Sequence, residues 1–390
     1  MTPFELRIPD AAIADLKTRL GLTRLPDAAP GEPPGDSWAF GSSVDYIREI
    51  VAYWKDGFDW RAQEAALNQF PQFKLPLHDI DLHYLHVPGV GPNPYPLLLM
   101  HGWPGSVFEF VDMIPRLTDP ARFGGDPRDA FTVIAPSLPG YGLSFTPGQK
   151  RFIIQDIAAC LHDLMTGVLG HKTFAAQGGD WGAGVASVMG QKYPSSLLGI
   201  HLNLLYVPRE KVAASSDGDV RFNERIAYFL KEEAGYQQIQ GTKPQTLAFG
   251  LTDSPAGLAA WIIERFRTWS DNDGVPDSAI GRDRMLANIS LYWFTAAIGS
   301  SFWPYYGRLH TGLPISPESI SAARWASHCA CWSRSFLLNG PCHSCVPFLA
   351  RTARRLSQSS ESMAKTPVGP TTRWSICSSL SGIGLACMAR

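Results

Sequence analysis

The stretch that decides the fold is QGGDWG, residues 177–182, which lies between a short apolar run and a segment of small residues. Glycines on both sides of Asp180 predict a turn too tight for ordinary side chains, with a strand before it and a helix after it. Such a unit places its central side chain at one end of a sheet. The carboxylate of Asp180 either caps the following helix or acts there as a reactive group.

Strand-like and helix-like segments alternate around this turn. Strands are predicted at residues 80–87, 96–100, 131–136, 173–177 and 198–202. We expect residues 80–87 to form the first strand of the sheet. Helices are predicted at residues 106–117, 152–169 and 182–193. Repeated βα units predict an α/β fold in which a mostly parallel sheet carries helices on both faces. We expect residues 91–204 to form the first part of this core.

Two helical regions flank this core in the sequence. Residues 1–90 begin with amphipathic helical segments and form a helical N-terminal region. Residues 205–300 lose the strand pattern and are rich in aromatic residues. An all-helical insertion after a strand of the core predicts a cap that covers the end of the sheet.

The composition restricts the partners of the chain. Its 390 residues, 45% of them hydrophobic, can bury one large core. The formal net charge is -1, with 34 basic and 35 acidic residues, so no overall field favours nucleic acid or an anionic membrane. The first residues do not have the apolar core of a signal peptide, and no later run has the length of a spanning helix. We therefore expect a cytoplasmic protein without a membrane anchor that acts on a small molecule.

The last part of the chain, residues 301–390, departs from this pattern at about residue 310. Six of the seven cysteines lie in the last 62 residues, and Asp283 is the last aspartate. We expect the C-terminal strands to be missing or disordered, and the segment to be frame-shifted or replaced. A group of cysteines around His343 has zinc-like spacing, but no ordered segment frames it, so we predict no metal site.

A second motif, HGWPGS at residues 101–106, follows the strand predicted at 96–100. In hydrolases built from such βα units, the corresponding loop presents a backbone N–H to a developing oxyanion, beside the N–H of the residue after the nucleophile. The predicted oxyanion-hole donors are therefore Trp103 and Trp181. We interpret His101 as a structural residue that organises this loop through hydrogen bonds.

An aspartate at the reactive position narrows the chemistry. Its carboxylate can displace a leaving group from an alkyl carbon and form an ester, which water must then cleave. Epoxides and haloalkanes are the obvious electrophiles of this kind. An epoxide oxygen needs a proton donor, for which a tyrosine hydroxyl is suited, whereas a halide needs a nest of N–H donors.

The sequence resembles the microsomal and juvenile-hormone type epoxide hydrolases over residues 1 to about 310. The matching segments are FELRIP at 4–9, HGWPGS at 101–106, SLPGYG at 137–142, GGDWG at 178–182, GYQQIQGTKP at 235–244 and YWFT at 292–295, followed by Ser300, Ser301 and Tyr305. The resemblance implies an α/β-hydrolase fold with a helical N-terminal segment and a helical cap.

The resemblance also implies the roles of the site residues. Asp180 is the nucleophile, and Tyr236 and Tyr305 hold and protonate the epoxide oxygen, with Tyr306 as the alternative if the register is shifted by one. The implied reaction turns a hydrophobic epoxide and water into a vicinal diol without a cofactor or metal. The oligomeric state stays open, with a homodimer among the alternatives.

One part of the family pattern is absent from the sequence. The family needs a histidine in a Gly-Gly-His-Phe segment, and an orienting acid, from the C-terminal third of the chain. The candidates by residue type follow no apolar strand; they are His310, His328 and His343, with Glu318 or Glu361. Three hypotheses therefore stay open: an epoxide hydrolase, a haloalkane dehalogenase-like enzyme, and a relative that binds an epoxide, is alkylated once and stalls.

Overall fold

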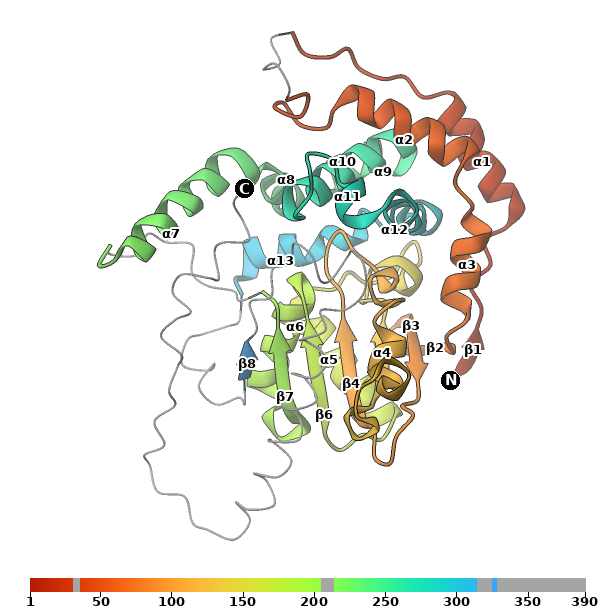
Figure 1. The fold of residues 1–390 in the computed structure, drawn as a ribbon, viewed down its shortest axis with the longest axis vertical. Helices are drawn as coiled ribbons and strands as arrows, with labels where there is room; N and C mark the ends of the chain where they lie inside the picture. Colours follow the sequence, from red (N-terminus) through yellow and green to blue (C-terminus); the bar gives the residue numbers. More distant parts are fainter. Residues whose placement is uncertain (31–35, 205–213, 314–324, 328–390) are drawn as a thin grey trace.

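The structure, a computed structural model, describes residues 1–30, 36–204, 214–313 and 325–327. Its centre is an eight-stranded sheet in the order β1-β2-β3-β5-β4-β6-β7-β8 (Figure 1). The strands are β1 (Thr2–Phe4), β2 (Gln72–Leu77), β3 (Ile80–Val87), β4 (Tyr95–Met100), β5 (Phe131–Pro136), β6 (Phe174–Gly178), β7 (Leu197–Leu202) and β8 (Trp325–Ser327). β5, β4, β6, β7 and β8 run parallel, whereas β1, β2 and β3 pair antiparallel at one side. The mostly parallel sheet confirms the predicted fold class.

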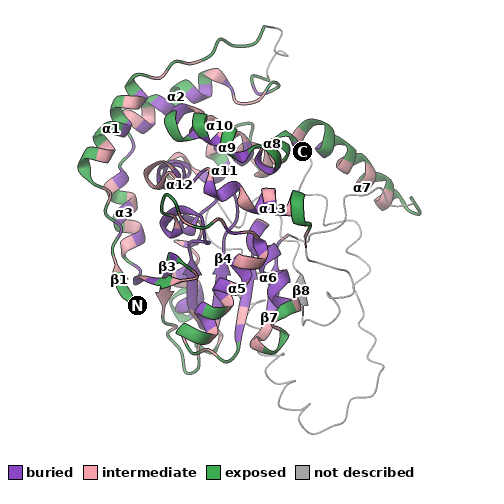
Figure 2. Ribbon diagram, turned by 180° about the vertical axis from the view of Figure 1, so that it is seen from behind, coloured by how far each residue is buried: buried purple, intermediate pink, exposed green. Residues whose placement is uncertain are grey.

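Helices cover both faces of this sheet. α4 (Ile114–Thr118) lies in front of it in Figure 1, whereas α5 (Ile154–Asp163) and α6 (Asp180–Lys192) lie in front in Figure 2, which is seen from behind. α6 is buried for most of its length because its first ten residues include only small or apolar side chains besides Asp180 and Ser187. A helix of small residues can approach the sheet closely, which fixes the first turn of α6 firmly against β6.

The structure corrects the expected first strand. The sequence places the first strand at residues 80–87, but β1 and β2 precede β3 in the sheet. β2 contains Lys74 and Pro76, which obscure its alternating pattern. The β2–β3 hairpin turns on His78 and Asp79, both at positive φ, instead of the asparagine-glycine pair that marks such turns.

The structure also corrects the helix expected at residues 106–117. This segment divides into a short 3₁₀ turn, η1 (Val107–Phe110), and α4. Ser106 caps η1 by accepting a hydrogen bond from the backbone N–H of Phe108 at 3.3 Å. The break turns the side chains of η1 toward the end of the sheet.

The C-terminal segment is described only in part. β8 extends the sheet beside β7 with three residue pairs, in the segment where missing strands were expected. The candidates His328, His343, Glu318 and Glu361, and the cysteine group around His343, lie outside the described residues.

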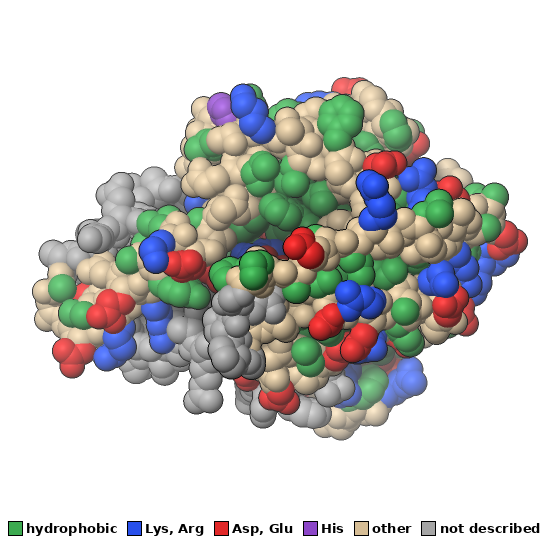
Figure 3. Space-filling view, turned by 90° about the horizontal axis from the view of Figure 1, so that it is seen from above, with side chains coloured by type: hydrophobic (Ala, Val, Ile, Leu, Met, Phe, Trp, Pro, Cys, Tyr) green, Lys and Arg blue, Asp and Glu red, His purple; other side chains and the backbone are tan. Residues whose placement is uncertain are grey.

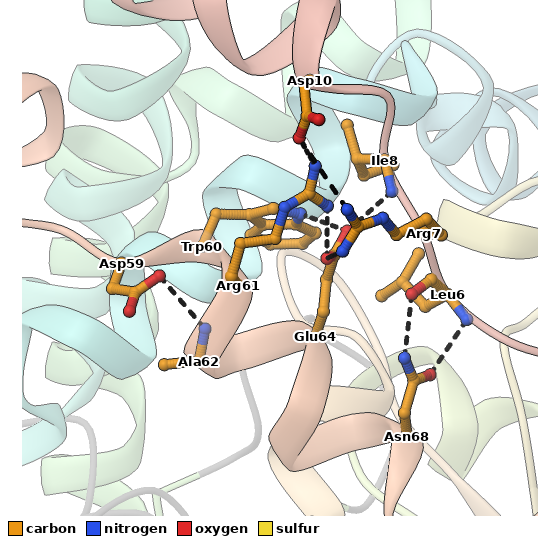
Figure 4. Close-up of polar contacts among 10 residues, drawn as sticks. All are labelled: Leu6, Arg7, Ile8, Asp10, Asp59, Trp60, Arg61, Ala62, Glu64 and Asn68. Atoms are coloured by element: carbon orange, nitrogen blue, oxygen red, sulfur yellow. Dashed lines mark hydrogen bonds and ion pairs between the residues drawn. The ribbon is translucent and has the colours of Figure 1, made fainter.

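The N-terminal segment lies along one side of the molecule (Figure 1), where polar side chains of α3 hold it (Figure 4). Glu64 of α3 (Trp60–Asn68) accepts hydrogen bonds from the backbone N–H of Ile8 at 2.6 Å and from the Trp60 indole at 2.7 Å. Asn68 exchanges two hydrogen bonds of 2.9 Å with the backbone of Leu6. α1 (Asp10–Gly21) and α2 (Val44–Asp56) then pack on the helices above the sheet.

A layer of helices lies above the carboxyl ends of the parallel strands (Figure 1). It comprises α7 (Asp217–Tyr228), α8 (Gly235–Thr242), α9 (Pro244–Asp253), α10 (Pro255–Trp269), α11 (Asp277–Ile280), α12 (Arg282–Thr295) and α13 (Trp303–Thr311). Figure 3 looks down on this layer and shows a hollow in which hydrophobic side chains gather. Within the described part of the chain, no helix has the length and apolar character needed to cross a membrane.

Candidate active site

The candidate site lies where two neighbouring parallel strands end. β4 pairs with β5 on one side and with β6 on the other, so the chain segments that leave β4 and β6 diverge at this point. In parallel sheets such a switch point opens a crevice at the carboxyl ends of the strands. The HGWPGS loop follows β4, and Asp180 follows β6.

The turn between β6 and α6 holds Asp180 in a strained backbone conformation. Its φ is 46°, a region that residues other than glycine rarely adopt. A Cβ on Gly178 would strike the carbonyl of Gly182, and a Cβ on Gly182 would strike the carbonyl of Met100. The glycines are therefore needed because backbone segments cross here, as the sequence predicted.

The HGWPGS loop closes on the Asp180 carboxylate. The backbone N–H of Trp103 donates a hydrogen bond to Asp180 Oδ1 at 2.8 Å, and the peptide bond between Trp103 and Pro104 is cis. A Cβ on Gly102 would collide with the Asp180 side chain, so only glycine lets the two come this close. This hydrogen bond fixes the position of the carboxylate beside the loop. Trp181 follows directly in the first turn of α6.

Side chains from below and above hold the loop in place. His101 Nε2 accepts a hydrogen bond from the backbone N–H of Leu138 at 3.1 Å, while Nδ1 lies 3.1 Å from the carbonyl of Gly102. Burial lowers the pKa of His101 to about 4, so the ring stays neutral. These contacts are those of the structural histidine that we expected.

α12 holds the same loop from the cap side. Asn288 Nδ2 donates to the carbonyl of Pro104 at 2.6 Å, and the Tyr292 hydroxyl donates to the carbonyl of Gly105 at 2.9 Å. Burial, with a contribution from nearby acidic groups, raises the pKa of Tyr292 far above its usual range. Tyr292 is therefore a fixed donor that secures the loop.

The two predicted tyrosines converge on the loop from different helices. Tyr236, in the first turn of α8, stacks on the Trp103 indole with ring centroids 5.5 Å apart and an interplanar angle of 9°. Tyr305 of α13 meets the edge of Trp181 at 4.8 Å and of Tyr236 at 5.7 Å. The alternative, Tyr306, stacks instead on His310 at 3.9 Å. The structure thus brings Tyr305, and not Tyr306, together with Trp103, Trp181 and Tyr236.

A buried cation backs the Tyr236 ring. The guanidinium carbon of Arg265 lies 5.3 Å from the Tyr236 ring centroid, and Arg265 is only 6% exposed. Arg265 pairs with Glu233 at 2.9 Å and with Glu264. A paired cation over a ring face holds the ring orientation, which fixes the hydroxyl that it carries.

A pocket lies directly beside Asp180. Its lining consists of Met100, Gly102, Trp103, Pro104, Gly105, Glu109, Gly179, Asp180, Asn203 and Phe266. Asp180 and Glu109 are the two ionisable side chains in this lining. Loss of water, and next the charge of Asp180, raise the pKa of Glu109 to about 8.

Sequence reasoning did not identify Glu109 or Asn203. Glu109 is the one acid in an otherwise apolar turn, VFEF, and this is the signal that could have found it. Asn203 directly follows β7, and the Cβ of any larger residue at Gly179 would lie 2.6 Å from its Oδ1. No histidine of the described segments belongs to the pocket lining, and the candidate His310 lies exposed at the end of α13.

The glycine-flanked turn at Asp180, the HGWPGS loop beside it and the helical layer above them are the features of an α/β-hydrolase. The model of the alpha/beta hydrolase fold matches residues 95–231, and the model of the epoxide hydrolase N terminus matches residues 1–110. The chain is 42% identical to a putative epoxide hydrolase of Stigmatella aurantiaca, covering 84% of this chain and 76% of that protein. It is 38% identical to epoxide hydrolase 1 of Oryctolagus cuniculus, covering 80% and 73%. The chain belongs to the epoxide hydrolases of the microsomal and juvenile-hormone type.

Solved structures agree with this assignment. The juvenile hormone epoxide hydrolase of the silkworm Bombyx mori is similar with a TM-score of 0.71 and 27% identity, over 93% of this chain and 95% of that one. The epoxide hydrolase of Aspergillus niger is similar with a TM-score of 0.72 and 25% identity, over 92% and 96%.

Proposed function

We propose that this chain converts a hydrophobic epoxide to a vicinal diol through an ester formed at Asp180. The observation that carries the proposal is the placement of Asp180, which sits at positive φ in the pocket with one oxygen held by the Trp103 N–H. The relatives named as epoxide hydrolases support the same reaction.

In the first step, the second carboxylate oxygen of Asp180 attacks an epoxide carbon and the ring carbon–oxygen bond breaks. Tyr236 and Tyr305 hold and protonate the departing oxygen, because a phenol stays protonated at neutral pH and donates to the more basic alkoxide. Their rings lie 5.7 Å apart and both contact Trp103, so the two tyrosines belong to one aromatic cluster. A haloalkane dehalogenase releases a halide, which does not need a pair of tyrosine proton donors.

In the second step, water attacks the ester carbonyl. The N–H groups of Trp103 and Trp181 are the proposed donors to the developing oxyanion. The tail carries no Gly-Gly-His-Phe segment, so we propose that residues from about 310 are frame-shifted or replaced and that the ester is cleaved slowly. The chain is then alkylated faster than it turns over.

Mass spectrometry of the intact ester tests the proposal. Incubation with styrene oxide should add one substrate mass to the peptide that contains Asp180, and Asp180→Asn should abolish this adduct. Asp112→Asn, which changes an exposed partner of Arg284, is the matched control and should be alkylated like the wild type. An adduct at full yield in Asp180→Asn would contradict the proposal, and halide release from a haloalkane would favour the dehalogenase.

The gene tests the proposed origin of the tail. Reading the sequence beyond codon 305 in the other two frames should reveal a Gly-Gly-His-Phe-like segment. A chain corrected in this way should form diol over many turnovers, whereas the present chain accumulates the ester. If no frame contains the segment and the present chain turns over rapidly, the interpretation of the tail is wrong.

A further inference from the structure

Two carboxyl groups line the pocket beside Asp180, and the reaction proposed above uses only that of Asp180. Asp180 and Glu109 both line the pocket, although they come from α6 and η1, on different sides of the HGWPGS loop. Two acids at one site can have different roles when their surroundings keep one protonated, as a proton donor, and the other ionised.

The loop is shaped around the Glu109 carboxyl group. A Cβ on Gly105 would coincide with Glu109 Oε1, so the carboxyl group fills the space that any other residue at 105 would occupy. η1 begins at the Ser106 cap and aims Glu109 inward, while its neighbours Val107, Phe108 and Phe110 are buried. This partly buried acid is therefore held beside the pocket by the packing of its neighbours.

The surroundings of Glu109 on balance disfavour its negative charge, although a hydrogen bond with the backbone of Ser106 acts in the opposite direction. Asp180 presents a like charge from α6, and Tyr292 of α12 donates its proton to the Gly105 carbonyl. Both cations of α12 are engaged elsewhere: Arg284 by Asp112 and the carbonyl of Phe108, and Arg282 by Asp277 and Glu49. The pKa of about 8 places a proton on Glu109 at neutral pH while Asp180 is ionised.

We propose that Glu109 is the proton store of this site, giving up its proton when Asp180 becomes an ester and recovering it from the water that cleaves the ester. The inference rests on the proposed function, because it needs the ester at Asp180. Esterification removes the charge of Asp180, and with it one of the causes that keep Glu109 protonated.

The protons balance over the proposed reaction cycle. During ring opening, Asp180 forms a carbon–oxygen bond, the epoxide carbon–oxygen bond breaks, and a tyrosine proton passes to the oxygen. The Glu109 proton restores the tyrosine, leaving a Glu109 carboxylate. Water then bonds to the ester carbonyl carbon and gives a proton to Glu109. The acyl carbon–oxygen bond breaks, the new carboxyl group gives its proton to the departing diol oxygen, and Asp180 is again ionised.

Proton uptake during a single round of alkylation tests the inference. The full chain is mixed with styrene oxide in weakly buffered solution containing an indicator dye, and ester formation is followed by mass. Near neutral pH the wild type should take up far less than one proton per ester, because Glu109 supplies it. Glu109→Gln keeps the size of the side chain but has no acidic proton to release. This variant should therefore take up about one proton from solution per ester formed. Asp112→Asn is the control and should match the wild type.

The wild type alone provides a second measurement. The number of protons taken up per ester should be lowest just below pH 8. It should rise above pH 8, because Glu109 is already ionised there in the free enzyme. Uptake of about one proton per ester at every pH in the wild type would overturn the inference while leaving the ester chemistry intact. A wild type that forms no Asp180 ester would overturn the proposed function itself, and this inference with it.

Discussion

The two halves of the site are held in place by different forces. The turns after β4 and β6 are positioned by backbone, since glycines at 102, 178 and 182 let main chain and the Asp180 side chain meet without room for a Cβ. The tyrosines are positioned by side chains, because Tyr236 and Tyr305 reach the site through contacts with Trp103, Trp181 and each other.

This difference separates a part of the site that is built by backbone from a part that is built by side chains. Backbone crossings at the ends of a buried parallel sheet leave no room for another arrangement, so the Asp180 carboxylate and the Trp103 N–H are held together without a ligand. Aromatic contacts between helices position the two tyrosines through their rings, so these contacts remain when a hydroxyl group is removed. Substitutions on the two sides should therefore have different effects on the alkylation rate and on the free energy of unfolding.

Removing the tyrosine hydroxyls should have the largest effect. Tyr236→Phe and Tyr305→Phe should each slow alkylation roughly 10²-fold, since a positioned acid is lost while the ring contacts remain. The double variant should lose more, with little change in thermal stability. The rate of adduct formation measures this effect.

Tyr306→Phe is the matched control for these variants. Tyr306 is the next residue in α13 but packs on His310 and Trp303, away from the cluster. It should react at the wild-type rate. A double Tyr236→Phe and Tyr305→Phe variant that is alkylated normally would show that these residues only pack the cap, and would move the function toward a dehalogenase.

Gly102→Ala should damage the backbone-positioned half. The added methyl group meets Asp180 directly, so the loop and the turn must separate, at a cost of about 1–3 kcal/mol in the free energy of unfolding. Alkylation should fall along with stability because the Trp103 N–H leaves Asp180 Oδ1. Chemical denaturation and adduct rates, measured on the same protein, test this coupling.

Gly235→Ala should have the smallest effect, of opposite sign. Gly235 precedes Tyr236 in α8, and nothing lies within 4 Å of the position of its added Cβ. Alanine in a helix restricts the unfolded chain, so the free energy of unfolding should rise by about 0.4–1 kcal/mol. Destabilisation as large as that of Gly102→Ala would contradict the distinction between the two halves.

The sequence by itself determined the turn at Asp180, the position of the HGWPGS loop and most elements of the core. These features are local: glycines mark the turns, and apolar runs mark buried strands wherever they lie in the chain. It did not reveal β1 and β2, because a three-residue edge strand and a hairpin turning on His78 and Asp79 carry no such mark. It also could not show that the segment 106–117 breaks in two.

Only the tertiary structure decided which distant residues meet. The resemblance named Tyr305 and kept Tyr306 as the alternative, and the rotation of α13 against α8 brings Tyr305 to Tyr236 while Tyr306 stacks on His310. Glu109 was missed because no local pattern in the sequence marks its proximity to Asp180. Its raised pKa comes from loss of water and from Asp180, 71 residues further along the chain, and both depend on how the loops fold together.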